Sequence, residues 1–397
     1  MFEKELIKLQ ELFDAGLFNK PFYMDKIQSK TNLSSYERFR TIPLTFKKDI
    51  RDSKILDRTT TKLDDVYGVF SSSGTTGDKT YYIYNKNDKS IHEEFVKAFY
   101  SELGVKQEDL GGIFAPIDTG VMAHTMMWQF TTMGAGYVTC TDPTPVNMAK
   151  VLKSVPITIV ATKPNAVSTM AHDLEFAKIA KESTVKKLFL GGGFLSKERR
   201  KLIEETWNAT CYNMFGMSEM FGPMAGECRQ RDGQHYLNQY LMIEILDPKT
   251  LQLCAPGKVG VAVYTTLWEK GFPLLRYWTG DLMSITYDIC KCGSALPRIR
   301  YKGRLDDSFF IDSHYIFPED LENILFSYGF CYEYLAILCK SNTVIVKVEK
   351  ELSKPKNRNM ENEVNELFGL PTKIDYYMPG ELGYHGSGLR FIKEAIL

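Results

Sequence analysis

The sequence predicts an α/β fold with a large N-terminal domain, residues 1–304, and a small, mobile α+β C-terminal domain, residues 305–397. Two observations support this. From about residue 90 to residue 207, strand-like apolar runs alternate with helical segments, which is typical of a parallel, doubly wound sheet with helices on both faces. Residues 211–304 are then rich in strand formers separated by Gly and Pro turns, which predicts a β-rich subdomain beside that sheet.

The elements follow from local patterns of apolar and polar residues. An amphipathic helix opens the chain and a helix with a turn at Pro43 follows. The next helices are expected at 92–103, 123–135, near 167–181 and at 196–207, with strands at 111–117, 136–140, 157–164 and 185–193 between them. In the C-terminal domain we expect helices at 318–327 and 360–369 and strands at 334–340, 343–350 and 373–379.

Composition excludes several classes of function. Lys plus Arg and Asp plus Glu both total 49, so the chain lacks the charge excess of a protein that binds nucleic acid or an anionic membrane. No apolar run approaches the ~20 residues of a membrane span, and the first twenty residues lack the apolar stretch of a signal peptide. The eight cysteines are mostly scattered, as in reduced proteins. We therefore expect a cytoplasmic globular protein.

A run of small residues lies between two strand-like segments, in VFSSSGTTGDKTYY. Its hydroxyl groups, backbone N–H groups and Lys79 predict a cradle for phosphate oxygens. The strand-like flanks argue against a flexible linker, and the spacing is not that of a Walker A loop. The seven residues of this phosphate loop are Ser71, Ser72, Ser73, Gly74, Thr75, Thr76 and Gly77.

The phosphate loop resembles that of the adenylate-forming superfamily of acyl-CoA synthetases and related ligases, with Asp78 in place of a Pro. Two further motifs follow in the family's order. The LFLGGG strand end places Gly192 and Gly193 where the family packs the adenine ring. The stretch CYNMFGMSEMFG is similar to the family's Y-G-x-[ST]-E motif, and its candidate nucleotide and magnesium residues are Phe215, Gly216, Ser218 and Glu219. Glu219 is the expected Mg²⁺ ligand and a catalytic candidate, because Mg²⁺ is usually held by one or two carboxylates with phosphate oxygens.

Two later motifs extend the resemblance. RYWTGD is similar to the family's R-Y-x-T-G-D, in which Asp281 would accept hydrogen bonds from both ribose hydroxyls. GRLDD resembles the hinge motif that precedes the family's swinging C-terminal domain. There, Arg304 would reach the ribose or a phosphate, and Asp306 would be the pivot between two half-reactions.

Three cysteines and one histidine form a candidate zinc site. Cys228 and His235 flank a hairpin-like turn, and Cys290 and Cys292 form a C-x-C pair further on. Three sulfurs and an imidazole make a closed tetrahedral shell for Zn²⁺, which is the structural pattern. Phenylacetate-CoA ligase-like members of the superfamily carry a similar C-x-C-G followed by PRI. The alternative is four unrelated buried or surface residues.

The chain departs from the family at two positions. The family ends with a Gly-Lys-x-x-R-like element whose lysine contacts the carboxylate and the α-phosphate, but the matching position here is Gly388 or Leu389. Lys79 and Lys393 are the two lysines that we predict to be catalytic, in addition to Glu219. Ser313 stands where members that admit a thiol usually have Gly, and its side chain would narrow the passage for a pantetheine arm.

The resemblance implies ATP- and Mg²⁺-dependent activation of a carboxylic acid as an acyl adenylate, followed by transfer to a thiol of CoA or of a carrier protein. Two alternatives remain open. The acceptor could be an amine or a protein cysteine, or the chain could be a non-catalytic homologue that binds nucleotide. The aromatic and Met-rich stretch from Phe114 to Tyr137 favours an aromatic or medium-chain acid. Within it, His124 and Trp128 are pocket candidates, although His124 could equally be a core residue.

Overall fold

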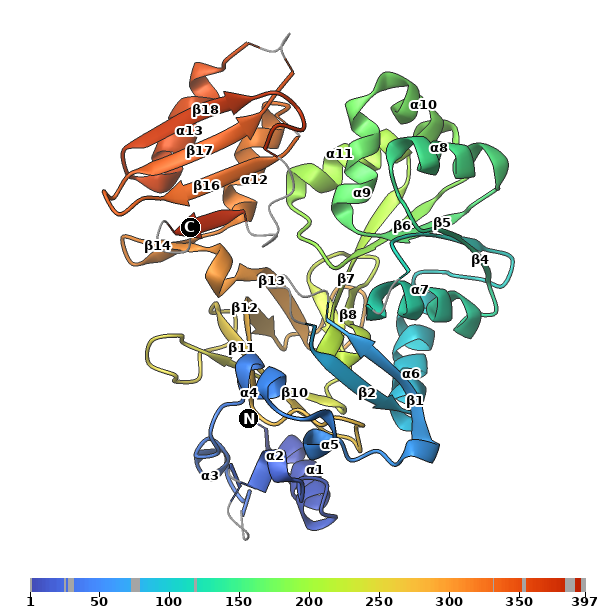
Figure 1. The fold of residues 1–397 in the computed structure, drawn as a ribbon, viewed down its shortest axis with the longest axis vertical. Coiled ribbons are helices and arrows are strands. Elements are labelled where there is room, and N and C mark those ends of the chain that lie inside the picture. The colour runs from blue at the N-terminus through green and yellow to red at the C-terminus, as the bar shows by residue number, and fades with distance from the viewer. Residues whose placement is uncertain are drawn as a thin grey trace.

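The structure is a computed structural model that describes residues 2–24, 26–27, 32–72, 79–117, 120–330, 332–351, 355–382 and 390–393. One continuous sheet of eleven strands forms its centre, in the order β10-β11-β12-β13-β9-β8-β7-β6-β5-β3-β4 (Figure 1). Five strands at one end run parallel. They are β3 (Leu110–Phe114), β4 (Gly136–Cys140), β5 (Ile159–Thr162), β6 (Lys187–Gly191) and β7 (Thr210–Met217).

Helices cover both faces of the parallel strands, which confirms the expected α/β fold. One face packs against α6 (Lys86–Glu102) and α7 (Val121–Thr132). The other packs against α8 (Pro145–Ser154), α9 (Pro164–Ser168), α10 (Leu174–Glu182) and α11 (Lys197–Trp207). The expected continuous helix near 167–181 was wrong. A 3-10 turn follows α9, and the Asp173 carboxylate accepts the backbone N–H groups of Glu175 and Phe176, so that α10 starts as a separate helix.

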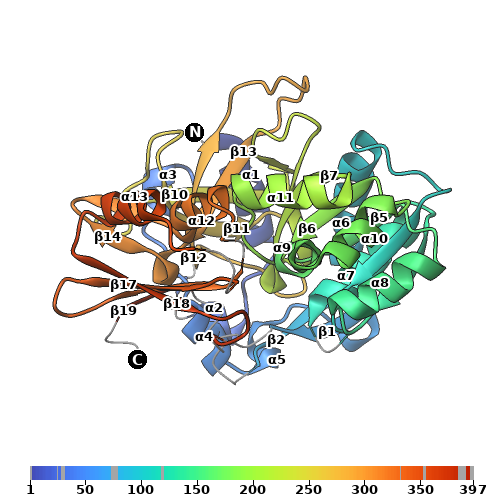
Figure 2. The ribbon, with the colours of Figure 1, turned by 90° about the horizontal axis from the view of Figure 1, so that it is seen from above.

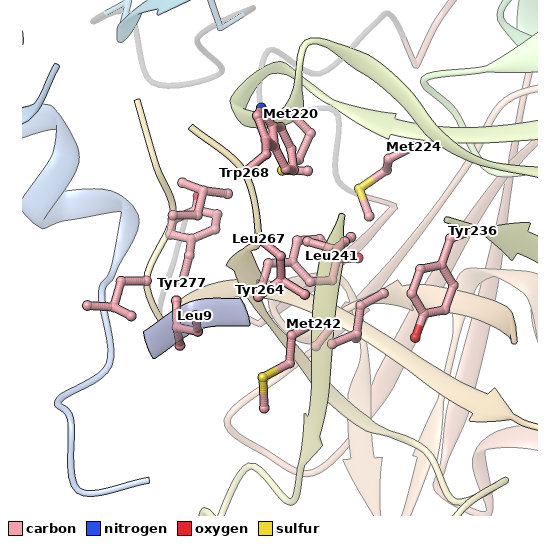
Figure 3. Packing of buried hydrophobic residues seen from close by; sticks show 14 of the residues in the cluster. Leu9, Met220, Met224, Tyr236, Leu241, Met242, Tyr264, Leu267, Trp268 and Tyr277 are labelled. Carbon is pink, nitrogen blue, oxygen red and sulfur yellow. The ribbon is translucent and has the colours of Figure 1, made fainter. Parts of the chain in front are cut away.

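The β-rich region continues the same sheet rather than forming a sheet of its own. Its six strands pair antiparallel, and a register shift bends the ladder between β7 and β8. The strands are β8 (Gly222–Glu227), β9 (Gln234–Tyr236), β10 (Leu241–Leu246), β11 (Gly260–Thr266), β12 (Tyr277–Thr286) and β13 (Arg298–Arg304). Helix α1 (Glu3–Asp14) buries Leu9 in a core shared with Met242 and Tyr277 from this region (Figure 3).

A separate pair of antiparallel strands, β1 (Val66–Ser71) and β2 (Tyr81–Asn85), flanks the predicted phosphate loop, which confirms that this loop joins two strands. Short elements lead up to them along the surface. They are α2 (Pro21–Met24), α3 (Tyr36–Phe39), α4 (Lys47–Asp52), α5 (Ile55–Arg58) and a 3-10 turn at Leu63–Asp65. Within the described part of the chain, no helix is both long and apolar enough to cross a bilayer. The cytoplasmic location stays a prediction.

The C-terminal part has the expected α+β pattern (Figure 2). A four-stranded sheet, in the order β18-β17-β16-β19, packs against two helices around Leu321, Val346 and Phe391. The elements of the C-terminal part are β14 (Phe309–Ile311), β15 (His314–Ile316), α12 (Pro318–Ser327), β16 (Tyr334–Leu338), β17 (Val344–Glu349), α13 (Arg358–Phe368), β18 (Thr372–Tyr377) and β19 (Phe391–Lys393). The domain boundary at residues 304 and 305 stays a prediction.

Candidate active site

The glycines after β6 lie at the carboxyl end of the parallel strands, where sheets of this kind bind ligands. Gly192 has a φ of +66°, and a Cβ there would lie 3.1 Å from the Met122 sulfur. A Cβ on Gly193 would lie 3.1 Å from the Pro164 ring. Side chains at either position would therefore fill the space at this edge of the sheet, which is compatible with the predicted approach of a flat ligand.

Glu219 lies directly after β7, on a 3-10 turn at Ser218–Met220, and is only 4% exposed. Two tyrosine hydroxyls donate to its Oε1, Tyr82 from β2 and Tyr277 from β12, each at 3.0 Å. Burial and the neighbouring carboxylate raise the pKa of both tyrosines, so both remain protonated donors. Among the described residues, both of these hydrogen bonds are made to Oε1 rather than to Oε2.

Asp281 and Arg304 face each other across the ladder of β12 and β13, with 3.8 Å between Arg304 Nη1 and Asp281 Oδ1. Asp281 is 6% exposed. Burial raises the pKa of Asp281 to about 6, and Arg304 offsets part of this effect. Glu219 also raises the pKa of Asp281, so the predicted magnesium ligand and the predicted ribose anchor lie within each other's electric field.

The two ends of the phosphate loop are fixed against each other. Ser71 forms a parallel bridge with Gly120, and the Ser72 N–H donates to the Thr80 carbonyl at 2.9 Å. Ser71 and Ser72 are buried, whereas Lys79 is exposed at the exit of the loop. The predicted residues from 73 to 77 lie outside the described residues. Tyr82 follows the loop in β2 and reaches Glu219, which connects the phosphate loop to the rest of the site.

The motif residues around Glu219 have structural partners that the sequence did not reveal. A Cβ on Gly216 would lie 2.3 Å from the Gly222 carbonyl oxygen, so the close approach of β7 and β8 itself requires glycine. The Phe215 ring packs against Tyr301, with 5.3 Å between ring centroids. Ser218 opens the 3-10 turn that carries Glu219. Contact of these residues with a nucleotide stays a prediction.

The predicted hinge follows β13 directly. Asp306 is exposed on a 3-10 turn at Leu305–Asp307. Its neighbour Asp307 accepts the backbone N–H groups of Arg390 and Phe391, each at 2.7 Å, and so fastens β19 to this turn. Lys393 is exposed at the end of β19, opposite Leu338 of β16. The positions that match the family's missing lysine, 388 and 389, lie outside the described residues.

The four candidate zinc ligands come together at the β8–β9 hairpin. Their ligand atoms all lie within 4.8 Å of one another. Cys228 Sγ and Cys290 Sγ are 3.8 Å apart, and Cys292 Sγ lies 3.6 Å from His235 Nε2. Tetrahedral Zn²⁺ with bonds of about 2.3 Å to sulfur and 2.0 Å to nitrogen requires separations of roughly 3.5–3.8 Å. His235 Nδ1 lies 3.0 Å from the Leu296 carbonyl, an arrangement that directs Nε2 towards a metal.

Sequence reasoning missed the two tyrosines that hold Glu219. Tyr277 lies inside the RYWTGD motif and Tyr82 in the TYYIY run, but no local pattern shows that both reach one carboxylate. It also gave no role to Lys47 at the start of α4, whose charge lowers the pKa of Asp281.

An aromatic cluster borders the phosphate-loop strand. The ring of His124, a pocket candidate, lies 5.2 Å from that of Phe70 on β1. Trp128 stacks against Tyr67 at 5.4 Å and against His92 at 5.1 Å. Burial lowers the pKa of His92 to about 3, so this imidazole is neutral. Trp128 is therefore held between the rings of Tyr67 and His92. Both Trp128 and His124 are half-buried.

Residues 22–265, well over half of the chain, match the family described as AMP-binding enzyme. The chain belongs to this family. The phenylacetate-coenzyme A ligase of Thermus thermophilus is 28% identical over 341 residues, which cover 81% of this chain and 74% of that relative. These findings confirm the resemblance to adenylate-forming ligases and the prediction of an enzyme of that class.

Solved structures of a 2-hydroxyisobutyryl-CoA ligase share the fold. Its postadenylation state, in complex with R3-HIB-AMP, matches with a TM-score of 0.82 at 20% identity, over 98% of this chain and 88% of that one. Its thioesterification state, in complex with 2-HIB-AMP and CoA, matches with a TM-score of 0.67 at 22% identity, over 98% and 89% of the two chains. The fold of an adenylate-forming ligase therefore extends over almost the whole chain.

Proposed function

We propose that this adenylate-forming enzyme activates an aromatic carboxylic acid with ATP and transfers the acyl group to CoA. In the first half-reaction, a carboxylate oxygen attacks the α-phosphorus, the bond to the bridging oxygen breaks, and pyrophosphate leaves. In the second, the CoA sulfur attacks the acyl carbon and AMP leaves. The observation that carries the proposal is Glu219, held by Tyr82 beside the phosphate loop and by Tyr277 four residues before Asp281.

Each predicted site residue has a role in this proposal. The phosphate loop and Lys79 hold the leaving phosphates, and Asp281 and Arg304 hold the ribose. Gly192 and Gly193 leave room for the adenine ring beside Phe215, and Gly216 and Ser218 shape the turn that presents Glu219. Glu219 Oε2 would ligate Mg²⁺, which when bound offsets phosphate charge. Preorganised charge and position of this kind supply most of the catalysis in phosphoryl chemistry.

The acid and the acceptor are proposed from separate observations. An aromatic acid suits the rings of Phe70 and His124 beside the phosphate loop. A CoA acceptor is favoured by relatives that are named as CoA ligases. The two states of the 2-hydroxyisobutyryl-CoA ligase match this chain with TM-scores of 0.82 and 0.67, which supports a C-terminal domain that pivots near Asp306 between half-reactions. Lys393 is proposed as the substitute for the missing lysine.

We also propose that Cys228, His235, Cys290 and Cys292 hold one structural Zn²⁺. The separations of the ligand atoms fit a closed tetrahedral shell, which leaves no position for substrate. The ion would tie the β8–β9 hairpin to the loop between β12 and β13, and so would brace the strand that carries Asp281.

Acid-dependent exchange between ATP and pyrophosphate tests the first half-reaction. We expect exchange with aromatic acids such as phenylacetate, and formation of an acyl-CoA, identified by mass, when CoA is added. Glu219→Gln should lower exchange by about a hundredfold and raise the Mg²⁺ concentration required. Glu182→Gln, at an exposed carboxylate of α10 that lies 3.9 Å from Lys178, is the control and should retain exchange. Absence of exchange with every acid would refute the proposed activity. An amide or acyl-protein product would show that the acceptor is an amine or a protein rather than CoA.

A further inference from the structure

A buried ion pair joins the N-terminal and C-terminal parts of the chain. Arg199 on α11 is 5% exposed and Glu322 on α12 is 2% exposed. The pair is bidentate, with Arg199 Nε donating to Glu322 Oε1 at 2.9 Å and Nη2 donating to Oε2 at 2.6 Å. The two helices lie side by side in both ribbon views (Figures 1 and 2). This is the strongest geometry for a charged contact, in a place with little water.

Each member of the pair also has polar partners on its own side. Arg199 Nη1 donates to Asn165 Oδ1 at 2.8 Å and to Ser168 Oγ at 3.2 Å, both from the N-terminal part. Glu322 Oε2 accepts the hydroxyl of Tyr334, from the C-terminal sheet, at 3.2 Å, and this hydroxyl also lies 3.2 Å from the Pro318 carbonyl. Across the interface, the hydroxyl of Ser196 from the N-terminal part also donates to Glu322 Oε1. If the two parts separated, each charge would keep at least one polar partner of its own, Asn165 and Ser168 for Arg199 and Tyr334 for Glu322, in addition to any hydrogen bonds gained from water.

The contact around the pair is larger than one salt bridge. The Glu198 N–H donates to Asn323 Oδ1 at 3.2 Å, and the rings of His172 and Tyr332 lie 4.1 Å apart. Leu202 of α11 packs against the core of the C-terminal part. The interface thus combines apolar packing with one buried charge pair, as interfaces between domains of a chain commonly do.

We propose that Arg199 and Glu322 form a reversible interface pair that sets the balance between two orientations of the C-terminal domain. The inference rests on the proposed two-step function. Any rotation about the turn at Leu305–Asp307 moves α12 relative to α11, so the pair must open. A buried pair that loses one partner is strongly disfavoured, whereas two charges that both keep polar partners separate at lower cost. Arg199 and Glu322 are positioning residues that touch no substrate.

The interface pair stabilises the orientation seen here and therefore favours the half-reaction that this orientation serves. Weakening the pair shifts the population towards the other orientation. The rates of the two half-reactions should then change in opposite directions. A loss of general stability would instead lower both rates together.

The test uses two variants of the full chain, Arg199→Met and Glu322→Gln. The matched control is Arg200→Met, because Arg200 is the next residue of the same helix and pairs with Glu227 inside the N-terminal part at 2.7 Å. Pyrophosphate exchange and transfer from preformed acyl adenylate to CoA are measured separately, and small-angle X-ray scattering reports the domain arrangement. We expect the ratio of the two rates to change at least about fivefold, in one common direction, in both variants and less than twofold in the control, with a changed scattering profile in the variants alone.

Equal changes in the rates of both half-reactions, or an unchanged scattering profile, would refute the proposed role of the Arg199–Glu322 pair. Wild-type protein with no exchange and no transfer would instead refute the proposed function, and scattering would still decide whether the pair sets the domain arrangement. If the variants do not fold, Glu198→Cys with Asn323→Cys decides. The oxidised, cross-linked protein should lose one half-reaction and regain it with dithiothreitol, and retention of both half-reactions while cross-linked would refute a reversible interface.

Discussion

Replacing Asp281 by Asn should stabilise the protein while weakening nucleotide binding. Burial raises the pKa of Asp281 from an ordinary value of 3.8 to about 6, despite Arg304 at 3.8 Å. The folded state therefore binds the proton of this carboxyl more tightly than the unfolded state does. The free energy of unfolding falls as the pH rises from about 4 to about 6, and the whole cost of ionisation is present above pH 6.

The size of the effect follows from the shift in pKa. A shift of about 2 units at ~1.4 kcal/mol per unit gives a cost of about 3 kcal/mol at pH 8. At pH 5 the same relation leaves roughly half of that cost, because the folded protein is then mostly protonated at this group. An amide of the same shape carries no charge and avoids this cost. The free energy of unfolding of Asp281→Asn should therefore exceed that of the wild type by about 3 kcal/mol at pH 8 and by about 1.5 kcal/mol at pH 5.

Urea unfolding followed by tryptophan fluorescence at both pH values measures this difference, and calorimetry with ATP measures binding. We expect at least about tenfold weaker ATP binding, because the charged acceptor for the ribose hydroxyls is lost. Asp232→Asn is the control, since hydrogen bonding to Arg300 lowers the pKa of Asp232 and its removal should not stabilise. Unchanged stability at pH 8, or a gain that does not diminish at pH 5, would refute the reasoning about Asp281.

Three further predictions concern single positions. Gly216→Ala should lower the free energy of unfolding by at least about 2 kcal/mol in chemical denaturation, because its Cβ would lie 2.3 Å from the Gly222 carbonyl oxygen; a neutral result would contradict the close approach of β7 and β8. Purified protein should contain one zinc per chain by mass spectrometry, and Cys290→Ser should lose the metal and melt at lower temperature; equal metal content in both would exclude the four-residue site. Ser313 has a φ of +68°, so Ser313→Gly should stabilise the protein by about 1 kcal/mol. Loss of the side chain should also accelerate acyl transfer to CoA but not pyrophosphate exchange. An unchanged transfer rate would mean that Ser313 does not narrow the thiol passage.

The sequence predicted those features that local patterns determine. The alternation of strands and helices from β3 to α11 follows from apolar periodicity, and strand ends followed by Gly or by an acidic residue indicated the candidate site. The single eleven-stranded sheet was beyond such patterns. It depends on pairs such as Arg298 with His235, which are far apart in the chain and adjacent only after β13 has docked on β9.

The convergence of the site was unpredictable for the same physical reason. Tyr82 and Tyr277 reach Glu219 because both tyrosines belong to one hydrophobic core, which draws on residues from the whole N-terminal part. The prediction of one continuous helix near 167–181 was wrong for a local reason. The Asp173 carboxylate accepts backbone N–H groups at the start of α10, and this cap competes with continuing the helix through Asp173. A pattern of apolar residues carries no information about that competition.

The pairing of buried carboxylates separates those that are compensated by a protein partner from those that are left for a ligand. Glu244 is fully buried and accepts two hydrogen bonds from Arg276, both at 3.1 Å, together with the hydroxyl of Tyr36 at 2.8 Å. Glu322 is bound by Arg199 in the same bidentate way. Asp281 is also buried, yet Arg304 approaches it only to 3.8 Å and its pKa remains raised. Since a native fold rarely keeps an under-compensated buried carboxylate without use, Asp281 is the one of these three whose compensation is expected to come from a ligand.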